Sequence, residues 1–280
     1  MERKKDTVIW MGAGQIGLAI VRRIASGKKI VVADRSLSRA QAAAGVLDAA
    51  GFDAVAVEAD LGSRPSVLSL IAEACKYGDI RHLVNAAGVS PSQAPVETIL
   101  RVDLYGTALL LEEVGKVMAW GGTGVTVSSQ SGYRLPALTP EEDRLLATTP
   151  VGELLSLEML RPENIRDTLH AYQLAKRCNV KRVMAEAVKW GRRGARINSV
   201  SPGIIVTPLA IDEFNGPRGG FYKDMFARCP AGRPGTADEV AHVAELLLGE
   251  KGAFITGSDF LMDGGATASY FYGPLRPDSR

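Results

Sequence analysis

The sequence has few of the residues that build disulfide frameworks and metal sites. Its 280 residues include only three cysteines and three histidines. The cysteines, Cys75, Cys178 and Cys229, form no CxxC pair. An odd number of dispersed cysteines argues against a disulfide framework or a zinc site and favours a reducing compartment. We therefore expect no metal centre and a cytoplasmic location.

Long apolar runs and an excess of one charge are also missing. The N-terminal apolar segment Val8–Met11 gives way at once to glycines and is too short for a signal peptide or a membrane span. Lysine and arginine number 33 and aspartate and glutamate 31, a formal net charge of +2. This balance provides no basic field for a nucleic acid or an anionic membrane. We expect neither as a partner.

What the sequence has is an alternation of short β-branched segments and longer Ala- and Leu-rich segments with helical spacing. This alternation predicts βαβ units and, with right-handed crossovers, a doubly wound parallel sheet with helices on both faces, a Rossmann-type α/β domain over residues 1–280. The predicted strands are Val8–Met11, Lys29–Ala33, Ala54–Glu58, His82–Asn85, Gly124–Ser128, Arg196–Ser201 and Ile255–Leu261. The predicted helices are Gly17–Ser26, Ser36–Ala50, Ser66–Cys75, Tyr172–Gly191 and Ala237–Leu248.

Two segments break this alternation. Residues 134–169 carry several prolines and are interpreted as an insertion with a helix or two of its own. Pro208–Pro234 is rich in glycine and proline, and a long loop of this kind next to a site is commonly a mobile lid. We predict that it is the substrate loop.

A glycine-rich motif, Gly12-Ala13-Gly14-Gln15-Ile16-Gly17, joins the first predicted strand to the first helix. Such glycines let the backbone approach a pyrophosphate, and the helix N-terminus supplies N–H groups and a partial positive charge. Alone the pattern is weak, because methyltransferases carry similar loops. Asp34 ends the second strand, where a carboxylate can bind a ribose 2′-hydroxyl and repel a 2′-phosphate. This favours NAD, whereas Arg35 could pair with the 2′-phosphate of NADP.

Tyr172 and Lys176 lie four residues apart in a predicted helix and share one face. An ammonium about 4 Å from a phenol favours the phenolate by roughly 4 kcal/mol at an effective dielectric constant of 20. A tyrosine in that position can serve as a general acid or base. The YxxxK pattern alone occurs by chance in many helices. It gains weight from three segments that follow other predicted strands: Asn85-Ala86-Ala87-Gly88, Ser128-Ser129-Gln130-Ser131-Gly132 and Pro202–Thr207.

With these segments in place, the chain resembles the short-chain dehydrogenase/reductase family from Val8 to Gly265. The resemblance implies that Tyr172 is the proton donor or acceptor and that Lys176 assists it and holds the nicotinamide ribose. It implies that Ser129, or alternatively Ser131, hydrogen-bonds the reacting oxygen. Besides the glycine loop, Asp34, Arg35, Tyr172 and Lys176, the implied cofactor contacts are Asp60, Leu61, Asn85, Ala86, Ala87, Gly88, Pro202, Gly203, Ile205 and Thr207. It also implies a structural role for Asp263-Gly264-Gly265 and a homodimer or homotetramer.

Three features depart from the family pattern. The first glycine loop is one residue shorter between its outer glycines, so the contacts of Gly12 and Gly14 are less secure than that of Gly17. Asp103 stands where the family usually has an asparagine whose carbonyl holds a water of the proton relay. A buried carboxylate there would add negative charge near Lys176. The segment between Ser129 and Tyr172 is longer than usual because of the insertion.

The sequence therefore predicts an oxidoreductase that moves a hydride between NAD(H), or NADP(H), and a secondary alcohol or ketone, such as a hydroxysteroid or another cyclic alcohol. The alternative is a non-catalytic dinucleotide-binding sensor or scaffold, for which Asp103 and the altered glycine loop leave room. A methyltransferase would leave Tyr172 and Lys176 without a task. The tail Tyr270–Tyr272 either packs on a neighbouring subunit or edges the substrate pocket. The insertion offers apolar walls for that pocket through Leu154, Leu155, Leu157, Met159 and Leu160.

Overall fold

Parallel β-strands form the centre of the computed structural model, which describes residues 5–216 and 219–277. Seven strands make one sheet in the order β3-β2-β1-β4-β5-β6-β9, and every neighbouring pair is parallel. They are β1 (Thr7–Met11), β2 (Lys29–Asp34), β3 (Asp53–Glu58), β4 (Ile80–Asn85), β5 (Thr123–Val127), β6 (Arg196–Pro202) and β9 (Asp259–Met262). The order reverses between β1 and β4, so the predicted doubly wound fold is confirmed.

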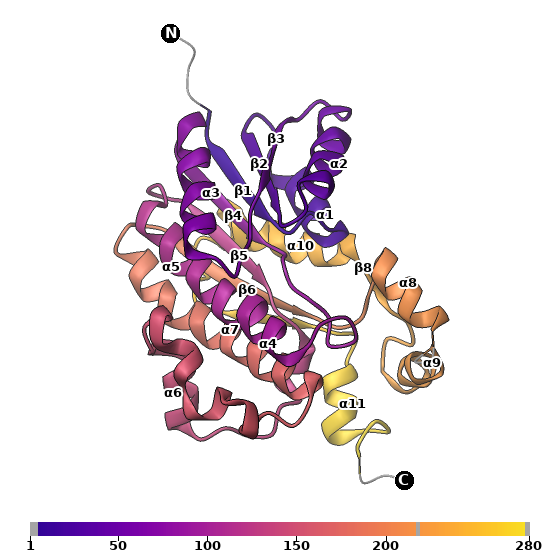
Figure 1. Ribbon diagram of the computed structural model, residues 1–280. Helices are drawn as coiled ribbons and strands as arrows, with labels where there is room; N and C mark the ends of the chain where they lie inside the picture. The colour runs from indigo at the N-terminus through magenta and orange to yellow at the C-terminus, as the bar shows by residue number, and fades with distance from the viewer. Residues whose placement is uncertain (1–4, 217–218, 278–280) are drawn as a thin grey trace.

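Helices cover both faces of this sheet (Figure 1). One face carries α1 (Gln15–Ile24), α2 (Leu37–Asp48) and α10 (Ala237–Leu248); the other carries α3 (Arg64–Tyr77), α5 (Thr107–Val117) and α7 (Thr168–Gly191). Successive residues of β1 alternate between the two cores, since Val8 and Trp10 pack with the first group and Ile9 and Met11 with the second. From Val8 to Met11 the strand is apolar, because both of its sides are buried.

Two predicted boundaries moved for local reasons. The last strand begins at Asp259 rather than at Ile255, because Gly257 has a positive φ of 71° that interrupts the extended chain. The helix of Tyr172 begins at Thr168, since the Asp167 side chain accepts a hydrogen bond of 2.7 Å from the His170 N–H and caps it. Upstream of α5, a short helix α4 (Val96–Ile99) continues into a π-helical turn, η1 (Leu100–Gly106).

The insertion forms the expected helix and lies against α7. It consists of α6 (Pro140–Thr148) and three 3₁₀ turns, η3 (Val151–Ser156), η4 (Glu158–Leu160) and η5 (Pro162–Asn164). A capping box between Thr139 and Glu142 starts α6. Leu154 and Leu160 are buried in the same core as α7. The insertion therefore extends the core on this side of the sheet.

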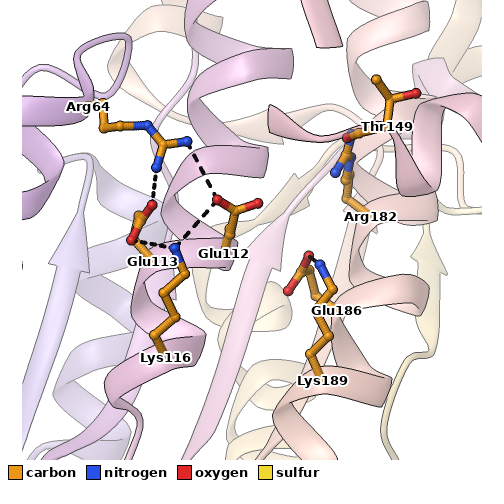
Figure 2. Close-up of polar contacts among 8 residues, drawn as sticks. All are labelled: Arg64, Glu112, Glu113, Lys116, Thr149, Arg182, Glu186 and Lys189. Atoms are coloured by element: carbon orange, nitrogen blue, oxygen red, sulfur yellow. Dashed lines mark hydrogen bonds and ion pairs between the residues drawn. The ribbon is translucent and has the colours of Figure 1, made fainter. Parts of the chain in front are cut away.

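Buried charged side chains hold these outer helices in place (Figure 2). Arg182 of α7 is 2% exposed and donates to the carbonyls of Leu146, at 2.7 Å, and Thr149, both in the insertion. On α5, Glu113 pairs with Arg64 of α3. Each of these groups is satisfied where it is buried, which is the condition for keeping a charge out of water.

The segment Pro208–Pro234 is not the open loop that the sequence suggested. It forms α8 (Pro208–Asn215) and α9 (Gly219–Arg228), while Pro217 and Arg218 lie outside the described residues. Phe214 of α8 makes edge-on contacts with Tyr222 and Phe226 of α9, at centroid distances of 5.3 and 5.6 Å. These aromatic contacts give the segment a small core of its own. Its movement as a lid stays a prediction. A two-stranded sheet of β7 (Ile205–Val206) and β8 (Gly235–Thr236) flanks it.

Other features were searched for only in residues 5–216 and 219–277. No helix in these ranges is long and apolar enough to cross a membrane. The same ranges contain no cluster of three or more His, Cys, Asp or Glu residues that could hold a metal ion. All three cysteines are free thiols, and Cys178 and Cys229 are buried.

His82 in β4 makes the stability of the fold depend on pH. Its Nδ1 lies 2.8 Å from Thr123 Oγ1, and burial, aided by Lys28 and Arg81, lowers the pKa of His82 from 6.5 to about 4. His82 takes up a proton below pH 6.5 in the unfolded chain, but only below about pH 4 in the folded chain. The stability from neutral His82 is thus complete above pH 6.5 and is lost as the pH falls toward 4.

Because of His82, we expect the free energy of unfolding to fall by about 3 kcal/mol as the pH is lowered from neutral to the folded-state pKa of this residue. Urea denaturation at a series of pH values measures the effect. His82→Gln should flatten that part of the curve, while His242→Gln, at an exposed histidine, should leave it as in the wild type. A curve for His82→Gln as steep as the wild-type curve would contradict the assignment.

Candidate active site

Tyr172 and Lys176 lie one turn apart on α7, and the Ser128–Gly132 segment rests on the same turn. The Lys176 Nζ is 5.1 Å from the centroid of the Tyr172 ring. Ser128 Oγ donates a hydrogen bond of 2.9 Å to the Lys176 carbonyl. Gly132 is needed for this approach, because a Cβ there would come within 2.8 Å of the α7 backbone at Arg177. The structure thus joins two motifs that the insertion separates in the sequence.

Ser129 opens the 3₁₀ turn η2 (Gln130–Tyr133) and remains partly exposed, as does Tyr172. Its Oγ accepts a hydrogen bond of 3.1 Å from the Ser131 N–H. This bond uses a lone pair of the hydroxyl and leaves the hydroxyl proton available to a bound molecule. Ser131, the alternative in the sequence, therefore supports Ser129 through its backbone.

Asp103 faces Lys176 in a buried ion pair. Its Oδ2 is 3.4 Å from the Lys176 Nζ, and the two side chains are 0% and 5% exposed. The other oxygen, Oδ1, accepts a hydrogen bond of 2.8 Å from the Val89 N–H. The Asp103 carboxylate, expected near Lys176 from the sequence, therefore contacts the Lys176 ammonium directly. Through Val89 it also links the segment after Gly88 to the π-helical turn η1.

Burial and charge act in opposite directions on this pair. Burial alone would lower the pKa of Lys176, but the facing carboxylate of Asp103 outweighs it and holds that pKa above its usual value. Burial raises the pKa of Asp103, and the ammonium of Lys176 opposes this shift. Gly88 leaves the space that the pair needs, since a Cβ there would lie 3.3 Å from the Lys176 Nζ and 3.4 Å from the Asp103 carboxylate. Lys176 is thus kept as an ammonium next to Tyr172.

The glycine loop lies at the reversal of strand order between β1 and β4. Gly12 has a φ of +89°, and a Cβ on it would come within 2.5 Å of the Ala87 backbone, so this loop touches the Asn85–Gly88 segment. Gly14 is the N-cap of α1, whose first turn, with Gln15 and Ile16, has no side-chain cap and no acidic residue. A Cβ on Gly14 would meet nothing within 4 Å. An open, uncapped helix N-terminus fits a dinucleotide pyrophosphate.

Gly17 has a packing role, because a Cβ there would lie 2.0 Å from the indole Nε1 of Trp10. Asp34 ends β2 beside the loop. Its oxygens accept hydrogen bonds from the N–H groups of Ala13, at 3.0 Å, and Ser36, at 2.9 Å. Each oxygen keeps a lone pair for a ribose hydroxyl. Arg35, next along the chain, is exposed.

Asp60 and Leu61 follow the edge strand β3, on the same face of the sheet as the Tyr172 helix. Leu61 is buried, and Asp60 Oδ1 accepts a hydrogen bond of 2.9 Å from the Gly62 N–H. Asn85, at the end of β4, is buried, and its amide contacts the Ala87 N–H at 3.4 Å and Thr107 Oγ1 at 3.5 Å. The Asn85 side chain thus links the Ala86–Gly88 segment to the start of α5.

The remaining predicted contacts lie beyond β6, which Pro202 ends. The Gly203 N–H donates to the Met262 carbonyl at 3.0 Å, and a Cβ on Gly203 would come within 2.7 Å of Asp263. Ile205 is buried in β7, and Thr207 Oγ1 accepts a hydrogen bond of 3.2 Å from the Ala210 N–H.

Asp263 caps α11 (Ala266–Tyr272) by accepting from the N–H groups of Gly265, at 2.9 Å, and Thr267, at 2.6 Å. These bonds agree with the structural role expected for the Asp263–Gly265 segment.

Two adjoining cavities lie between these loops, α9 and α11. One, of about 150 Å³, is bordered by Gln130, Gly203–Ile205 and Met225; the other, of about 350 Å³, is lined by Arg134, Met225 and Tyr270 among others. The leucines of the insertion line neither of them. Leu154 and Leu160 pack in the core with apolar residues of α7. Leu155 is exposed to solvent.

Arg134, at the start of the insertion, is the cavity residue that sequence reasoning missed. Its position five residues after Ser129, in a loop that follows a strand, was the available signal. Tyr270 borders the larger cavity, which agrees with the pocket-edge alternative for the aromatic tail.

Comparison with known proteins agrees with this architecture. Residues 6–139 match the family model described as short chain dehydrogenase, and residues 136–267 match the one described as enoyl-(acyl carrier protein) reductase. Short-chain dehydrogenase/reductase bsc3 of Alternaria brassicicola is 39% identical over 265 residues, covering 94% of this chain and 96% of that protein. D-threitol dehydrogenase of Mycolicibacterium smegmatis is 30% identical over 273 residues, covering 94% and 93%. A solved short-chain dehydrogenase/reductase from Serratia marcescens has a TM-score of 0.73 at 24% identity, covering 95% and 98%.

The chain therefore belongs to the short-chain dehydrogenase/reductase family. It is an NAD(P)-dependent oxidoreductase that acts on CH–OH groups. The family, the enzyme class and the nicotinamide dinucleotide cofactor expected from the sequence are thus confirmed.

Proposed function

We propose that this enzyme oxidises a secondary alcohol, or reduces the matching ketone, with Tyr172 as the acid–base group and NAD(H) as the cofactor. The observation that carries the proposal is the buried Lys176 ammonium, 5.1 Å from the centroid of the Tyr172 ring, on a helix turn that also seats the Ser129 segment. An acid–base group and a fixed cation therefore lie on the helix turn against which the segment with the Ser129 hydroxyl packs.

Each of these side chains has one task during oxidation. Ser129 donates its hydroxyl proton in a hydrogen bond to the alcohol oxygen and holds it near Tyr172. The Lys176 ammonium stabilises Tyr172 as the phenolate, and the phenolate oxygen takes the hydroxyl proton of the alcohol as general base and becomes the neutral phenol. Bound NAD⁺ supplies the acceptor for the hydride. In reduction Tyr172 returns the proton to the carbonyl oxygen.

Asp34 supports NAD over NADP. Its carboxylate is held at the end of β2 by the N–H groups of Ala13 and Ser36. It is thereby oriented toward the loop in which the adenosine ribose of a dinucleotide would lie. A ribose 2′-hydroxyl can donate to it, whereas a 2′-phosphate would be repelled.

The substrate class that we propose runs from polyols to cyclic alcohols. The similarity to a D-threitol dehydrogenase supports an alcohol with neighbouring hydroxyl groups. The apolar wall of the larger cavity supports a ring or an alkyl chain, and a hydroxysteroid remains one candidate. The expected homodimer or homotetramer stays a prediction, which light scattering of the purified chain checks.

A panel of polyols, cyclohexanols and hydroxysteroids, assayed with NAD⁺ and NADP⁺ by the absorbance of the reduced nicotinamide, tests the proposal. We expect turnover of at least one alcohol, with a higher kcat/KM for NAD⁺. Asp34→Ala should narrow the difference between the two cofactors without changing the choice of alcohol. Turnover of no alcohol would contradict the activity, and a preference for NADP⁺ would contradict the role of Asp34.

A further inference from the structure

The larger of the two cavities has an unusual combination of charge and apolar surface. Of the described residues that line it, the charged ones are all arginines: Arg134, Arg228 and Arg276. Phe221 and Met225 of α9 provide much of the apolar wall. At about 350 Å³ it falls within the size range of small-molecule sites.

The three arginines differ in how their charges are used. Arg228 is committed to the fold, since it pairs with Asp224 and donates to the Pro274 carbonyl at 2.8 Å. Arg134 has no ion pair within the described part of the chain. Its Nη2 donates to Gln130 Oε1 at 2.9 Å, and its guanidinium carbon lies 5.3 Å from the centroid of the Tyr270 ring.

Burial makes the unpaired charge of Arg134 costly. Its Nε is buried and has no hydrogen-bond partner in residues 5–216 and 219–277. Burial lowers the pKa of Arg134, with Asp263 and Tyr270 opposing, yet an arginine stays protonated in proteins. The carboxylate of Asp263 does not meet this charge as an ion pair, because both of its oxygens cap α11. A partly buried cation with an unused donor is suited to an anion from outside the chain.

The position of Arg134 connects it to the reacting end of the site. It follows the 3₁₀ turn that begins at Ser129, and its partner Gln130 borders the smaller cavity together with Gly203. Met225 lines both cavities, so the two cavities adjoin at the Met225 side chain. Because Gln130 directly follows Ser129, a molecule that binds at Ser129 and enters the smaller cavity would extend past Met225 toward Arg134.

We infer that the substrate is a hydroxy acid or keto acid, whose carboxylate binds Arg134 while its hydrocarbon part packs against Phe221, Met225 and Tyr270. The inference rests on the proposed alcohol–ketone chemistry and adds the class of substrate. A carboxylate matches the planar guanidinium because both can form two parallel hydrogen bonds. The apolar wall strengthens this pairing by excluding water.

Turnover of cyclic and aliphatic secondary hydroxy acids, each compared with its own methyl ester, tests the inference. We expect the wild type to prefer the acid, and Arg134→Met to lower kcat/KM for the acid by about 10- to 100-fold. The ester, which carries no charge for Arg134 to pair with, should lose much less kcat/KM than the acid in Arg134→Met. Arg144→Met, at an exposed arginine of α6, is the matched control and should keep the wild-type preference. Arg134→Lys should recover part of the preference.

Binding to the NADH-loaded enzyme separates this inference from the proposed activity. Calorimetry with cyclohexanecarboxylate and cyclohexanecarboxamide requires no turnover. Tighter binding of the carboxylate that is lost in Arg134→Met supports the inference, whether or not any alcohol is oxidised. A failure to oxidise any alcohol would overturn the proposed activity alone. Equal binding of the two ligands, or oxidation of esters in preference to acids, overturns the inference and leaves the activity standing. Should Arg134→Met fail to fold, the wild-type comparison of the two ligands decides.

Discussion

Tyr172→Phe is expected to abolish turnover while leaving NADH binding nearly unchanged. The substitution removes the hydroxyl group that exchanges a proton with the substrate oxygen. It keeps the ring that packs next to the Lys176 Nζ, 5.1 Å from its centroid. General acid–base catalysis contributes about 10²- to 10⁴-fold, so we expect kcat to fall by at least that order. NADH fluorescence titration and the absorbance assay measure the two effects.

A second tyrosine provides the matched control. Tyr77→Phe removes a hydroxyl group that donates to Glu73 at 2.9 Å on α3, away from the site, and should keep full activity. Activity in Tyr172→Phe close to that of Tyr77→Phe would refute the assignment of Tyr172.

Loss of the Asp103 carboxylate should have the second large effect. In Asp103→Leu the ammonium of Lys176 stays buried without its partner, and the Val89 N–H loses its acceptor. Removing one member of a buried ion pair costs about 3–5 kcal/mol. We expect the free energy of unfolding, measured by urea denaturation, to fall by that amount.

Asp103→Asn separates charge from packing. Asparagine keeps the shape of the side chain and an acceptor for Val89 but removes the negative charge that raises the pKa of Lys176. Burial then lowers that pKa, so the ammonium loses its proton at a lower pH. We expect the alkaline limb of the kcat/KM profile to move to lower pH, because deprotonated Lys176 no longer stabilises the phenolate.

Asp143→Asn is the matched control for this shift. Asp143 lies on α6 of the insertion. It pairs with Arg177, at 2.6 Å, and Lys181, at 3.0 Å, both on α7, the helix that carries Lys176. Its loss should lower stability without moving the pH profile. If Asp103→Asn and Asp143→Asn gave the same profile, Asp103 would have only a structural role.

Much of the site was predictable because its motifs follow strands of a parallel sheet. Gly12, Asn85, Ser129 and Pro202 each stand at or just after the end of a strand, and such ends meet at one edge of the sheet. The pairing of Tyr172 with Lys176 follows from helical spacing. The continuous apolar run Val8–Met11 likewise follows from the burial of β1 on both faces of the sheet. These inferences need only local geometry and the order of the elements.

Other features depended on contacts that no local pattern encodes. The predicted loop at Pro208–Pro234 became two helices because Phe214 meets the aromatic side chains of α9. Leu154 and Leu160 of the insertion lie in the core, on the side where Arg182 fixes the end of α6 on α7. In both cases a tertiary contact outweighed the composition of the segment.

The sequence by itself determined the fold, the cofactor class and the pair Tyr172 and Lys176, because each follows from a period or a motif at the end of a strand. Only the tertiary structure decided how these groups are charged and what surrounds them. It placed Asp103 at 3.4 Å from Lys176, and among the described residues it gave Arg134 no ion pair at a cavity with an apolar wall. The physical reason is that burial and charge pairing depend on residues far apart in the chain, whose distances arise only when all the elements pack.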